Sequence, residues 1–159
     1  MRIGHGYDAH RLKAGRPCIL CGVRVPCAFG PDGHSDADAP IHALMDALLG
    51  ALALGDIGGL FPDIEGKYKD ADSMALLRHV YGKIASMGYR LVNADITIIL
   101  QKPKLSPFIE DMRLKTANVL NTGINNISIK ATTEEKMGFT GDGTGIRAHA
   151  VVLLEKTEE

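Results

Sequence analysis

The chain has 159 residues, of which 45% are hydrophobic and 23% are charged, and this is the composition of an ordinary globular protein that can bury one core. Its net charge of −1 provides no overall positive field for nucleic acid or an anionic membrane surface. No apolar run approaches the ~20 residues of a membrane span. We therefore expect one domain over residues 1–159, with no nucleic-acid partner and no membrane segment.

The first half of the chain begins with a predicted strand over residues 2–12, where polar and apolar residues alternate. A short strand in a hairpin is expected around residues 19–25, between glycines and prolines. Residues 28–40 have the composition of a loop, and a helix follows within residues 36–55. Asp36 or Asp38 is expected to cap this helix, and Gly55 to end it.

The second half contains a predicted loop over residues 55–63 and an amphipathic helix over 72–87. A strand over 89–100, a helix over 106–120 and strands over 127–133 and 146–154 follow. This order predicts an α+β fold: a two-layer sandwich with a mixed four-stranded sheet, helices on one face and a small β-hairpin. Because the strands are apolar on both sides, we expect a second subunit to cover the free face of the sheet.

Three cysteines form one cluster, at Cys18, Cys21 and Cys27. The stretch "CILC" matches C-x-x-C, which indicates either a redox pair or half of a zinc site. No second C-x-x-C follows, and a strand would point Cys18 and Cys21 to opposite faces, so packing is the favoured interpretation. An odd number of cysteines favours a reducing compartment, and we expect the cytoplasm.

The opening stretch "GHGYDAHRL" carries Asp8 and His10 two residues apart, so a strand would place both side chains on one face. His42 follows within the first predicted helix. Two histidines and one carboxylate are three ligands with an open fourth position, which is typical of catalytic zinc. The alternatives are a polar pair on an exposed strand and an unrelated helical histidine. Asp46, one turn after His42, either orients that histidine or lies on a solvated helix face.

Two further clusters carry polar groups. "HSD" at residues 34–36 precedes the helix of His42 and would bring an imidazole and a hydroxyl to a metal bound there. "KATTEEKMGFTG" ends a strand with Thr132, Thr133, Glu134 and Glu135. Hydroxyls and amides suit phosphate oxygens, and a carboxylate suits magnesium, although a strand end and a solvated turn would also explain these residues. His5 would face away from His10, and we assign neither His79 nor His149 to the metal.

The stretches "RIGHGYDAHRL", "HSDADAPIHALMDALLGALALGDIGGLFPD", "DITIILQKPKL" and "IKATTEEKMGFTG" together resemble the 2-C-methyl-D-erythritol 2,4-cyclodiphosphate synthase family of the non-mevalonate isoprenoid pathway. The resemblance implies a catalytic domain that acts as a phosphorus–oxygen lyase. The reaction would convert 4-diphosphocytidyl-2-C-methyl-D-erythritol 2-phosphate to the cyclic diphosphate and CMP. It also implies a homotrimer with active sites between neighbouring subunits.

The resemblance further implies zinc bound by Asp8, His10 and His42, and magnesium or manganese bound by Glu135. It implies that His34 and Thr133 stabilise the transition state. Contacts to the methylerythritol part and the 2-phosphate are implied for Ser35, Asp56, Ile57, Gly58, Phe61, Pro62, Asp63, Ile64 and Glu65. Contacts to the cytidine diphosphate and the rest of the substrate are implied for Leu100, Gln101, Lys102, Pro103, Lys104, Leu105, Ser106, Thr132 and Phe139.

The chain departs from the family pattern at position 142, where family members often carry a basic residue and this chain has Asp142. Glu134 and His149 also differ from the usual pattern. None of the three is among the expected metal ligands. Two other functions stay open at this point: a zinc-stabilised trimer that binds nucleotide without catalysis, and a zinc phosphohydrolase that releases inorganic phosphate.

Overall fold

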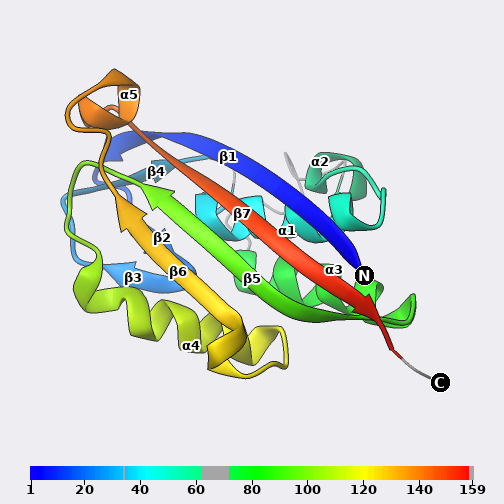
Figure 1. The fold of residues 1–159 in the computed structure, drawn as a ribbon. Coiled ribbons are helices and arrows are strands. Elements are labelled where there is room, and N and C mark those ends of the chain that lie inside the picture. Colours follow the sequence, from blue (N-terminus) through cyan, green and yellow to red (C-terminus); the bar gives the residue numbers. More distant parts are fainter. Residues whose placement is uncertain (34, 62–71, 158–159) are drawn as a thin grey trace.

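The computed structural model describes residues 1–33, 35–61 and 72–157. Five strands form a mixed sheet, with helices behind it in the view of Figure 1. In spatial order the strands are β4 (Phe29–Asp32), β1 (Arg2–Ala14), β7 (Gly145–Lys156), β5 (Tyr89–Ile99) and β6 (Ile127–Thr132). Strands β2 (Cys18–Leu20) and β3 (Val23–Val25) form a separate hairpin. The predicted α+β class is confirmed.

The sheet has one strand more than the sequence predicts. The stretch expected to be a loop contains β4, which pairs antiparallel with the end of β1 from Arg11 to Ala14. Its Pro31 argued against a strand, because proline lacks the amide that a sheet interior requires. At the edge of a sheet only one side of the strand is paired, so the proline is tolerated there.

Strand β5 pairs antiparallel with β7 but parallel with β6, and the two parallel strands end at the same edge of the sheet. The segments that leave β5 and β6 therefore emerge side by side. A register shift between Leu91 and Asn93 also changes one detail of the prediction. Strict alternation would bury Val92 together with Ala94 and Ile96. Instead Leu91 is buried and Val92 is partly exposed, so the alternation holds only from Ala94 onward.

Three helices carry most of the second layer: α1 (Ala39–Ala51), α3 (Ser73–Ser86) and α4 (Ile109–Val119). Short helical turns are α2 (Ile57–Leu60), η1 (Ser106–Phe108), η2 (Ile124–Asn126) and α5 (Gly138–Gly141). Asp38 caps α1, as one of the two predicted candidates, and its carboxylate also accepts hydrogen bonds from the amides of Cys21 and Gly22. Burial raises the pKa of Asp38 to about 7.

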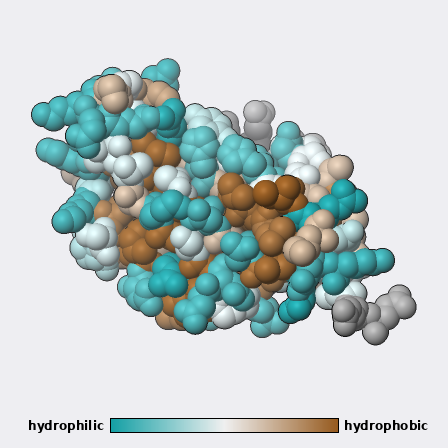
Figure 2. Space-filling model, in the orientation of Figure 1, coloured by the Kyte–Doolittle hydropathy of each residue, from teal (hydrophilic) through white to brown (hydrophobic). Residues whose placement is uncertain are grey.

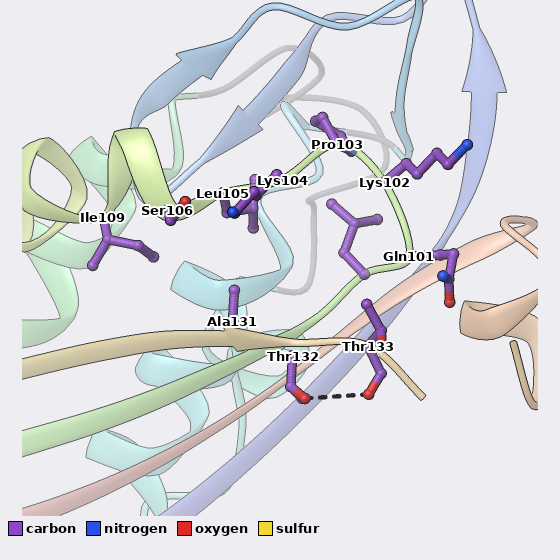
Figure 3. A pocket seen from close by; sticks show the side chains of 11 residues that line it. Gln101, Lys102, Pro103, Lys104, Leu105, Ser106, Ile109, Ala131, Thr132 and Thr133 are labelled. Carbon is purple, nitrogen blue, oxygen red and sulfur yellow. Dashed lines mark hydrogen bonds between the residues drawn. The ribbon is translucent and has the colours of Figure 1, made fainter. Parts of the chain in front are cut away.

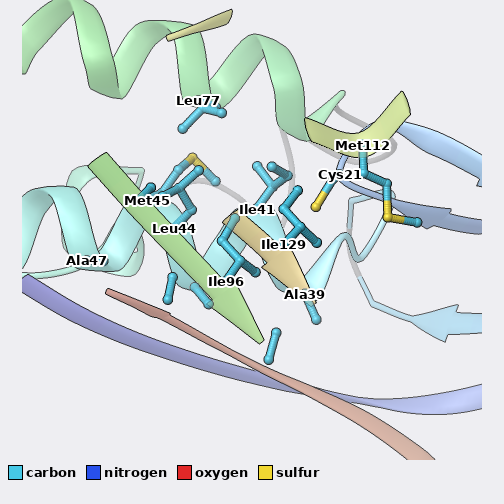
Figure 4. Close-up of a cluster of buried hydrophobic side chains, with 14 of the residues drawn as sticks. Cys21, Ala39, Ile41, Leu44, Met45, Ala47, Leu77, Ile96, Met112 and Ile129 are labelled. Atoms are coloured by element: carbon cyan, nitrogen blue, oxygen red, sulfur yellow. The ribbon is translucent and has the colours of Figure 1, made fainter. Parts of the chain in front are cut away.

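The hydrophobic core lies between the sheet and the helices (Figure 4). Fully buried aliphatic side chains come from α1, α3 and the central strands, among them Leu44, Leu77 and Ile96. Each contributes about 1.5–3 kcal/mol by its removal from water. Cys18 and Cys21 are free and buried, and burial raises the pKa of Cys18 to about 12. The packing interpretation of these cysteines is therefore confirmed.

Helix α1 approaches strand β1 unusually closely, and two glycines permit the contact. A Cβ on Gly4 would lie 1.9 Å from the carbonyl oxygen of Ala47, and one on Gly6 would lie 1.8 Å from that of Ala43. No side chain fits at these distances, so helix backbone rests directly on strand backbone. The contact sets the distance between the part of β1 beyond Gly6 and the first turns of α1.

The face of the sheet turned away from the helices carries exposed apolar side chains (Figure 2). Ile3 is 73% exposed, Tyr7 46% and Val151 39%, and all three belong to the neighbouring strands β1 and β7. The described helices do not cover this side of the sheet. Within the described ranges, no helix combines the length and the apolar character that crossing a membrane requires.

Candidate metal centre and adjoining pockets

Asp8, His10 and His42 meet on the helix side of β1. Asp8 Oδ2 lies 2.8 Å from His10 Nε2 and 3.0 Å from His42 Nδ1, and the two imidazole nitrogens are 3.4 Å apart. The prediction that these three side chains come together is confirmed. Ligands on a tetrahedral zinc with bonds of ~2.0–2.2 Å are roughly 3.3 Å from one another, so this donor set fits such an ion.

The ring nitrogens that face away from this cluster have partners that fix each imidazole. His10 Nδ1 lies 3.0 Å from the carbonyl oxygen of Asp32, and His42 Nε2 lies 3.1 Å from Ser73 Oγ. An N–H on each of these nitrogens leaves the inward nitrogens free to act as ligands. Asp36 in turn accepts hydrogen bonds from the hydroxyl and the amide of Ser73. Such outer contacts orient metal-binding histidines.

The three side chains already form a charged cluster without an ion. Burial alone would raise the pKa of Asp8, but hydrogen bonds from His10 and His42 outweigh it and hold the pKa at about 2. Burial also tends to lower the pKa of His10, yet its hydrogen bond to Asp8 and the carboxylate charge raise that pKa overall. Asp8 therefore stays ionised and available to a cation over the whole physiological range.

Asp46 fits neither of its two predicted roles. Its Oδ1 accepts a hydrogen bond of 2.8 Å from the amide of Ile57, which ties α1 to the start of α2. It neither orients His42 through a hydrogen bond nor lies on a solvated face, since it is half-buried. Burial raises the pKa of Asp46. Its contribution to the site is to hold the segment that carries Ile57.

A small pocket of about 160 Å³ adjoins the metal-ligand cluster. It is lined by His10, Ser35, His42, Met45, Ile57, Phe61 and Leu76. Three residues with predicted contacts to the methylerythritol part or its 2-phosphate, Ser35, Ile57 and Phe61, thus lie around the cluster. Asp56 caps α2 through a 2.8 Å hydrogen bond from the amide of Gly59, and Gly58 is exposed beside it.

A larger pocket of about 500 Å³ lies where β5 and β6 end together (Figure 3). It is lined by Leu100, Gln101, Lys102, Pro103, Lys104, Leu105, Ser106, Ile109, Ala131, Thr132 and Thr133. The predicted nucleotide-binding stretch is therefore concave and continuous with the end of β6. The two pockets share no lining residue.

The end of β6 presents oxygen atoms beside this pocket. Thr133 Oγ1 donates a 3.0 Å hydrogen bond to Glu135 Oε1, and both residues are solvent-accessible. Glu135 and Lys136 have positive φ angles of 52° and 66°, which non-glycine residues rarely adopt. A carboxylate and a hydroxyl held together at the mouth of a pocket fit a hard divalent cation that also binds phosphate. Phe139 of α5 does not line this pocket but a separate one, with His10 and Arg11 of β1.

Several predicted residues lie elsewhere or outside the described residues. His34 and the stretch from Pro62 to Glu65 fall outside them. His5 and His149 pair on the opposite face of the sheet, with His5 Nε2 3.2 Å from His149 Nδ1. The ring of His79 contacts Phe61.

Asp142 is exposed and accepts hydrogen bonds from the amide and the hydroxyl of Thr144, which lower its pKa.

Sequence reasoning missed the residues that support the metal ligands. The carbonyl of Asp32 contacts His10, the hydroxyl of Ser73 contacts His42, and Asp36 acts only through Ser73. No local pattern links Asp32 or Ser73 to the histidines. Gly4 and Gly6 did carry a signal, because two glycines in one strand indicate a close backbone approach. That signal would have placed a helix directly against β1.

Comparison with known proteins places the chain in a family. A family model described as the YgbB family matches residues 1–155. The chain belongs to the YgbB family. It is 57% identical to a 2-C-methyl-D-erythritol 2,4-cyclodiphosphate synthase from Clostridioides difficile (strain 630), over 100% of this chain and 99% of the relative.

Two solved structures extend the comparison of this YgbB-family chain. The bifunctional IspDF from Campylobacter jejuni is similar with a TM-score of 0.95 and 41% identity, over 99% of this chain and 42% of the longer one. A 2C-methyl-D-erythritol-2,4-cyclodiphosphate synthase in a form bound to CDP has a TM-score of 0.89 and 38% identity. That match covers 97% of this chain and 100% of the other.

Proposed function

We propose that this protein is a 2-C-methyl-D-erythritol 2,4-cyclodiphosphate synthase. It converts 4-diphosphocytidyl-2-C-methyl-D-erythritol 2-phosphate to 2-C-methyl-D-erythritol 2,4-cyclodiphosphate and CMP. One observation carries the proposal: a three-ligand metal cluster with its own small pocket occurs together with a second pocket at the strand ends, in a chain 57% identical to a relative of that name. The reaction class is that of a phosphorus–oxygen lyase.

The metal cluster supports zinc as one cofactor. Asp8, His10 and His42 supply one carboxylate and two imidazoles, with the spacing and the outer hydrogen bonds that zinc ligands require. Glu135, with an oxygen beside Thr133, would hold magnesium or manganese together with phosphate oxygens. Cations bound at these two places supply positive charge to the phosphates of the substrate.

The large pocket supports binding of the cytidine diphosphate. Its lining combines residues 100–106, several of them apolar, with Thr132 and Thr133, whose hydroxyls would face the phosphates. A relative of the same fold has been solved with CDP bound. The small pocket, with Ile57 and Phe61 around the metal ligands, has the apolar character that the methylerythritol part would meet.

The reaction is an intramolecular phosphoryl transfer. An oxygen of the 2-phosphate attacks the β-phosphorus, a new oxygen–phosphorus bond forms, and the bond from that phosphorus to the oxygen of CMP breaks. CMP leaves with the electron pair of the broken bond. Because the attacking phosphate is already an anion, no strong base is required. The protein has to bring two phosphates together and reduce their mutual repulsion, which positioning and fixed dipoles achieve.

Individual side chains have separate tasks in this step. The hydroxyl of Thr133 and the imidazole of His34 would stabilise the charge that builds up on the transferred phosphoryl group. Ser35, whose Oγ lies 3.3 Å from His42 Nε2, would hold the 2-phosphate end near the zinc ligands. Losing one such preorganised donor typically lowers turnover by about 10²–10³.

Two features support a homotrimer with active sites between subunits. The free face of the sheet is apolar, and the two pockets of one chain share no residue, so a neighbouring chain would bring the complementary pocket. Light scattering at micromolar concentration should give about three times the 17.1 kDa chain mass. A monomer mass would contradict the trimer.

Free cysteines suit a reducing compartment, in keeping with a cytoplasmic enzyme.

The test of function is one assay by phosphorus NMR on the zinc-loaded protein with magnesium. The expected products are the cyclic diphosphate and CMP in equal amounts. Release of inorganic phosphate would indicate a phosphohydrolase instead. Binding of CDP without turnover of substrate would indicate a nucleotide-binding protein without catalysis, and either result would overturn the proposed function.

A further inference from the structure

The loop after β6 carries two adjacent carboxylates in different environments. Glu134 turns inward, where one carboxylate oxygen pairs with Arg147 of β7 and the other accepts a hydrogen bond from the hydroxyl of Thr140. Glu135 stays at the surface beside Thr133. Neighbouring residues of the same type have thus been given one structural and one accessible position.

The inward pair is more protected than an ordinary surface ion pair. The side chains of Arg147 and Glu134 are only 29% and 27% exposed, and the guanidinium lies 5.8 Å from the ring centre of Phe139. Thr140, the second partner of Glu134, is fully buried. Arg147 Nε is buried without a hydrogen-bond partner among the described residues, which is an unfavourable arrangement that the other contacts must offset.

The loop between these contacts has a backbone that needs support. Glu135 and Lys136 both have positive φ angles, and the Lys136 backbone is so close to Gly141 that a Cβ there would lie 2.3 Å from the Lys136 carbonyl carbon. The amide of Lys136 also donates a 3.3 Å hydrogen bond to Gln101 Oε1 in the large pocket. The conformation that aims Glu135 is therefore held from both sides, by Glu134 and by Lys136.

We propose that the Glu134–Arg147 pair is a positioning device that presents Glu135, and not Glu134, as the accessible carboxylate at this end of β6. The pair keeps Glu134 away from the cation and cancels its charge, so that the phosphates of the substrate meet one carboxylate rather than two. It fixes the strained turn that brings Glu135 to Thr133. This inference rests on the proposed function, in which Glu135 binds the second divalent cation.

The test measures binding of Mn²⁺ rather than turnover. Protein loaded with one zinc per chain is titrated with Mn²⁺ in the presence of CDP, and free Mn²⁺ is followed by electron paramagnetic resonance. Loss of an outer contact typically weakens metal binding by 10–100-fold. We expect weakening in that range for Glu134→Ala and for Arg147→Met. Glu134→Gln, whose amide oxygen can still accept from Thr140, should be weakened less.

The matched control is Asp95→Asn, which removes the Lys130–Asp95 ion pair from the same face of the sheet without touching the loop. It should bind Mn²⁺ as the parent does. CDP binding without Mn²⁺ should be unchanged in every variant, which also shows that each variant is folded. Glu135→Ala provides the reference for complete loss of the cation.

Three results would overturn the inference. Mn²⁺ affinities of Glu134→Ala and Arg147→Met within about twofold of the parent would remove any positioning role, given the 10–100-fold expected. An equal loss in Asp95→Asn, or an equal loss of metal-free CDP binding, would indicate a general effect on the fold. If either result is obtained while the parent protein still forms the cyclic product, the positioning role of the Glu134–Arg147 pair is wrong and the proposed function stands. A parent with no CDP-dependent Mn²⁺ site would remove the proposed role of Glu135 as well.

Discussion

Strand β1 carries histidines on both of its faces, and the two faces differ in what accompanies them. On the helix side, Asp8 and His10 meet His42 of α1. On the free side, His5 lies 3.2 Å from His149 of β7, and the ring of Tyr7 lies 5.0 Å from that of His149. Imidazole nitrogens are about equally close in both groups. Only the helix side includes a carboxylate.

The carboxylate reverses the electrostatics of the two groups. Despite burial, Asp8 raises the pKa of His10, so the helix side attracts positive charge. On the free side, burial, His5 and Arg147 together lower the pKa of His149, so His149 favours its neutral form. Two close histidines are therefore not enough to predict a cation site. The negative ligand and the fixed ring orientations make the difference.

The largest expected effect is the loss of the helix-side metal. His42→Ala and Asp8→Ala should each lose zinc or bind it far more weakly, by more than the ~10–100-fold of an outer-contact change, because a direct ligand is gone. His149→Ala is the matched control from the free side and should keep about one zinc per chain. The measurement is the zinc content of each purified protein by metal analysis. Full zinc in both ligand variants would contradict the assignment.

Removing the support of one ligand should have a smaller effect. Ser73→Ala deletes the hydroxyl 3.1 Å from His42 Nε2 and leaves Asp36 without that partner. We expect zinc affinity to fall by roughly 10–100-fold with the trimer intact. Competition with a chelator of known affinity measures the change. His5→Ala removes a ring contact on the free side and should not alter the result. An unchanged affinity in Ser73→Ala would mean that Ser35, whose Oγ lies 3.3 Å from His42 Nε2, and packing orient His42 without Ser73.

The charge of Asp8 should also appear in the stability of the metal-free protein. The lowered pKa of Asp8, about 2 against 3.8, stabilises the fold above pH 3.8, and this contribution is lost as pH falls toward 2. The raised pKa of His10 stabilises the fold below pH 6.5, and this contribution is lost as pH rises through the folded value. Both act together between these limits.

Asp8→Asn should therefore destabilise the chelator-treated protein most near pH 5, by about 1–2 kcal/mol, and less at pH 9. Urea unfolding at the two pH values is the measurement. His149→Asn is the comparison from the free side and should show no such loss near pH 5. Equal losses for Asp8→Asn at both pH values would mean that its charge does not act through His10.

The smallest expected effect comes from giving the free side its missing carboxylate. Val151 is paired with His5 and lies two residues from His149 on the same face of β7. Val151→Asp should tighten zinc binding there by at least several-fold, since a charge at ~4 Å contributes ~1 kcal/mol in water and more where a neighbouring subunit excludes water. Calorimetry in a His42→Ala background isolates this site, with Val151→Asn as the control. Equal binding by the Asp and Asn variants would refute the importance of the charge.

Local periodicity predicted that Asp8 and His10 share a face, and the resemblance to the synthase family then selected the full ligand set with His42 from the open alternatives. Asp8 and His10 alternate onto the helix side of β1, and His42 reaches them from the first turn of α1, where the helix packs on the strand. The strand ends beside the large pocket were predicted through the resemblance, and the parallel pairing of β5 and β6 gives the physical reason. Element boundaries with strong caps, such as Asp72 before α3, were also predictable.

Other features depend on tertiary contacts that no window of sequence contains. Strand β4 exists because β1 extends far enough to offer it an edge, which outweighs the unfavourable Pro31. Asp46 acts on Ile57 rather than on His42 because α2 folds back against α1. The inward turn of Glu134 requires Arg147, which lies on another strand. In each case the partner is distant in the chain, so the residue alone does not reveal its role.

The close backbone contact of α1 with Gly4 and Gly6 has a thermodynamic consequence. Asp8 and His42 are 34 positions apart, and only the packed strand and helix bring their ligand atoms together. An unfolded chain offers a cation no comparable site, so a cation held by these residues binds the native state alone. Its free concentration then sets the folding equilibrium, adding about 2.7 kcal/mol at 100 times the dissociation constant. Through the glycine contact, the concentration of free metal thus becomes a determinant of the stability of the fold.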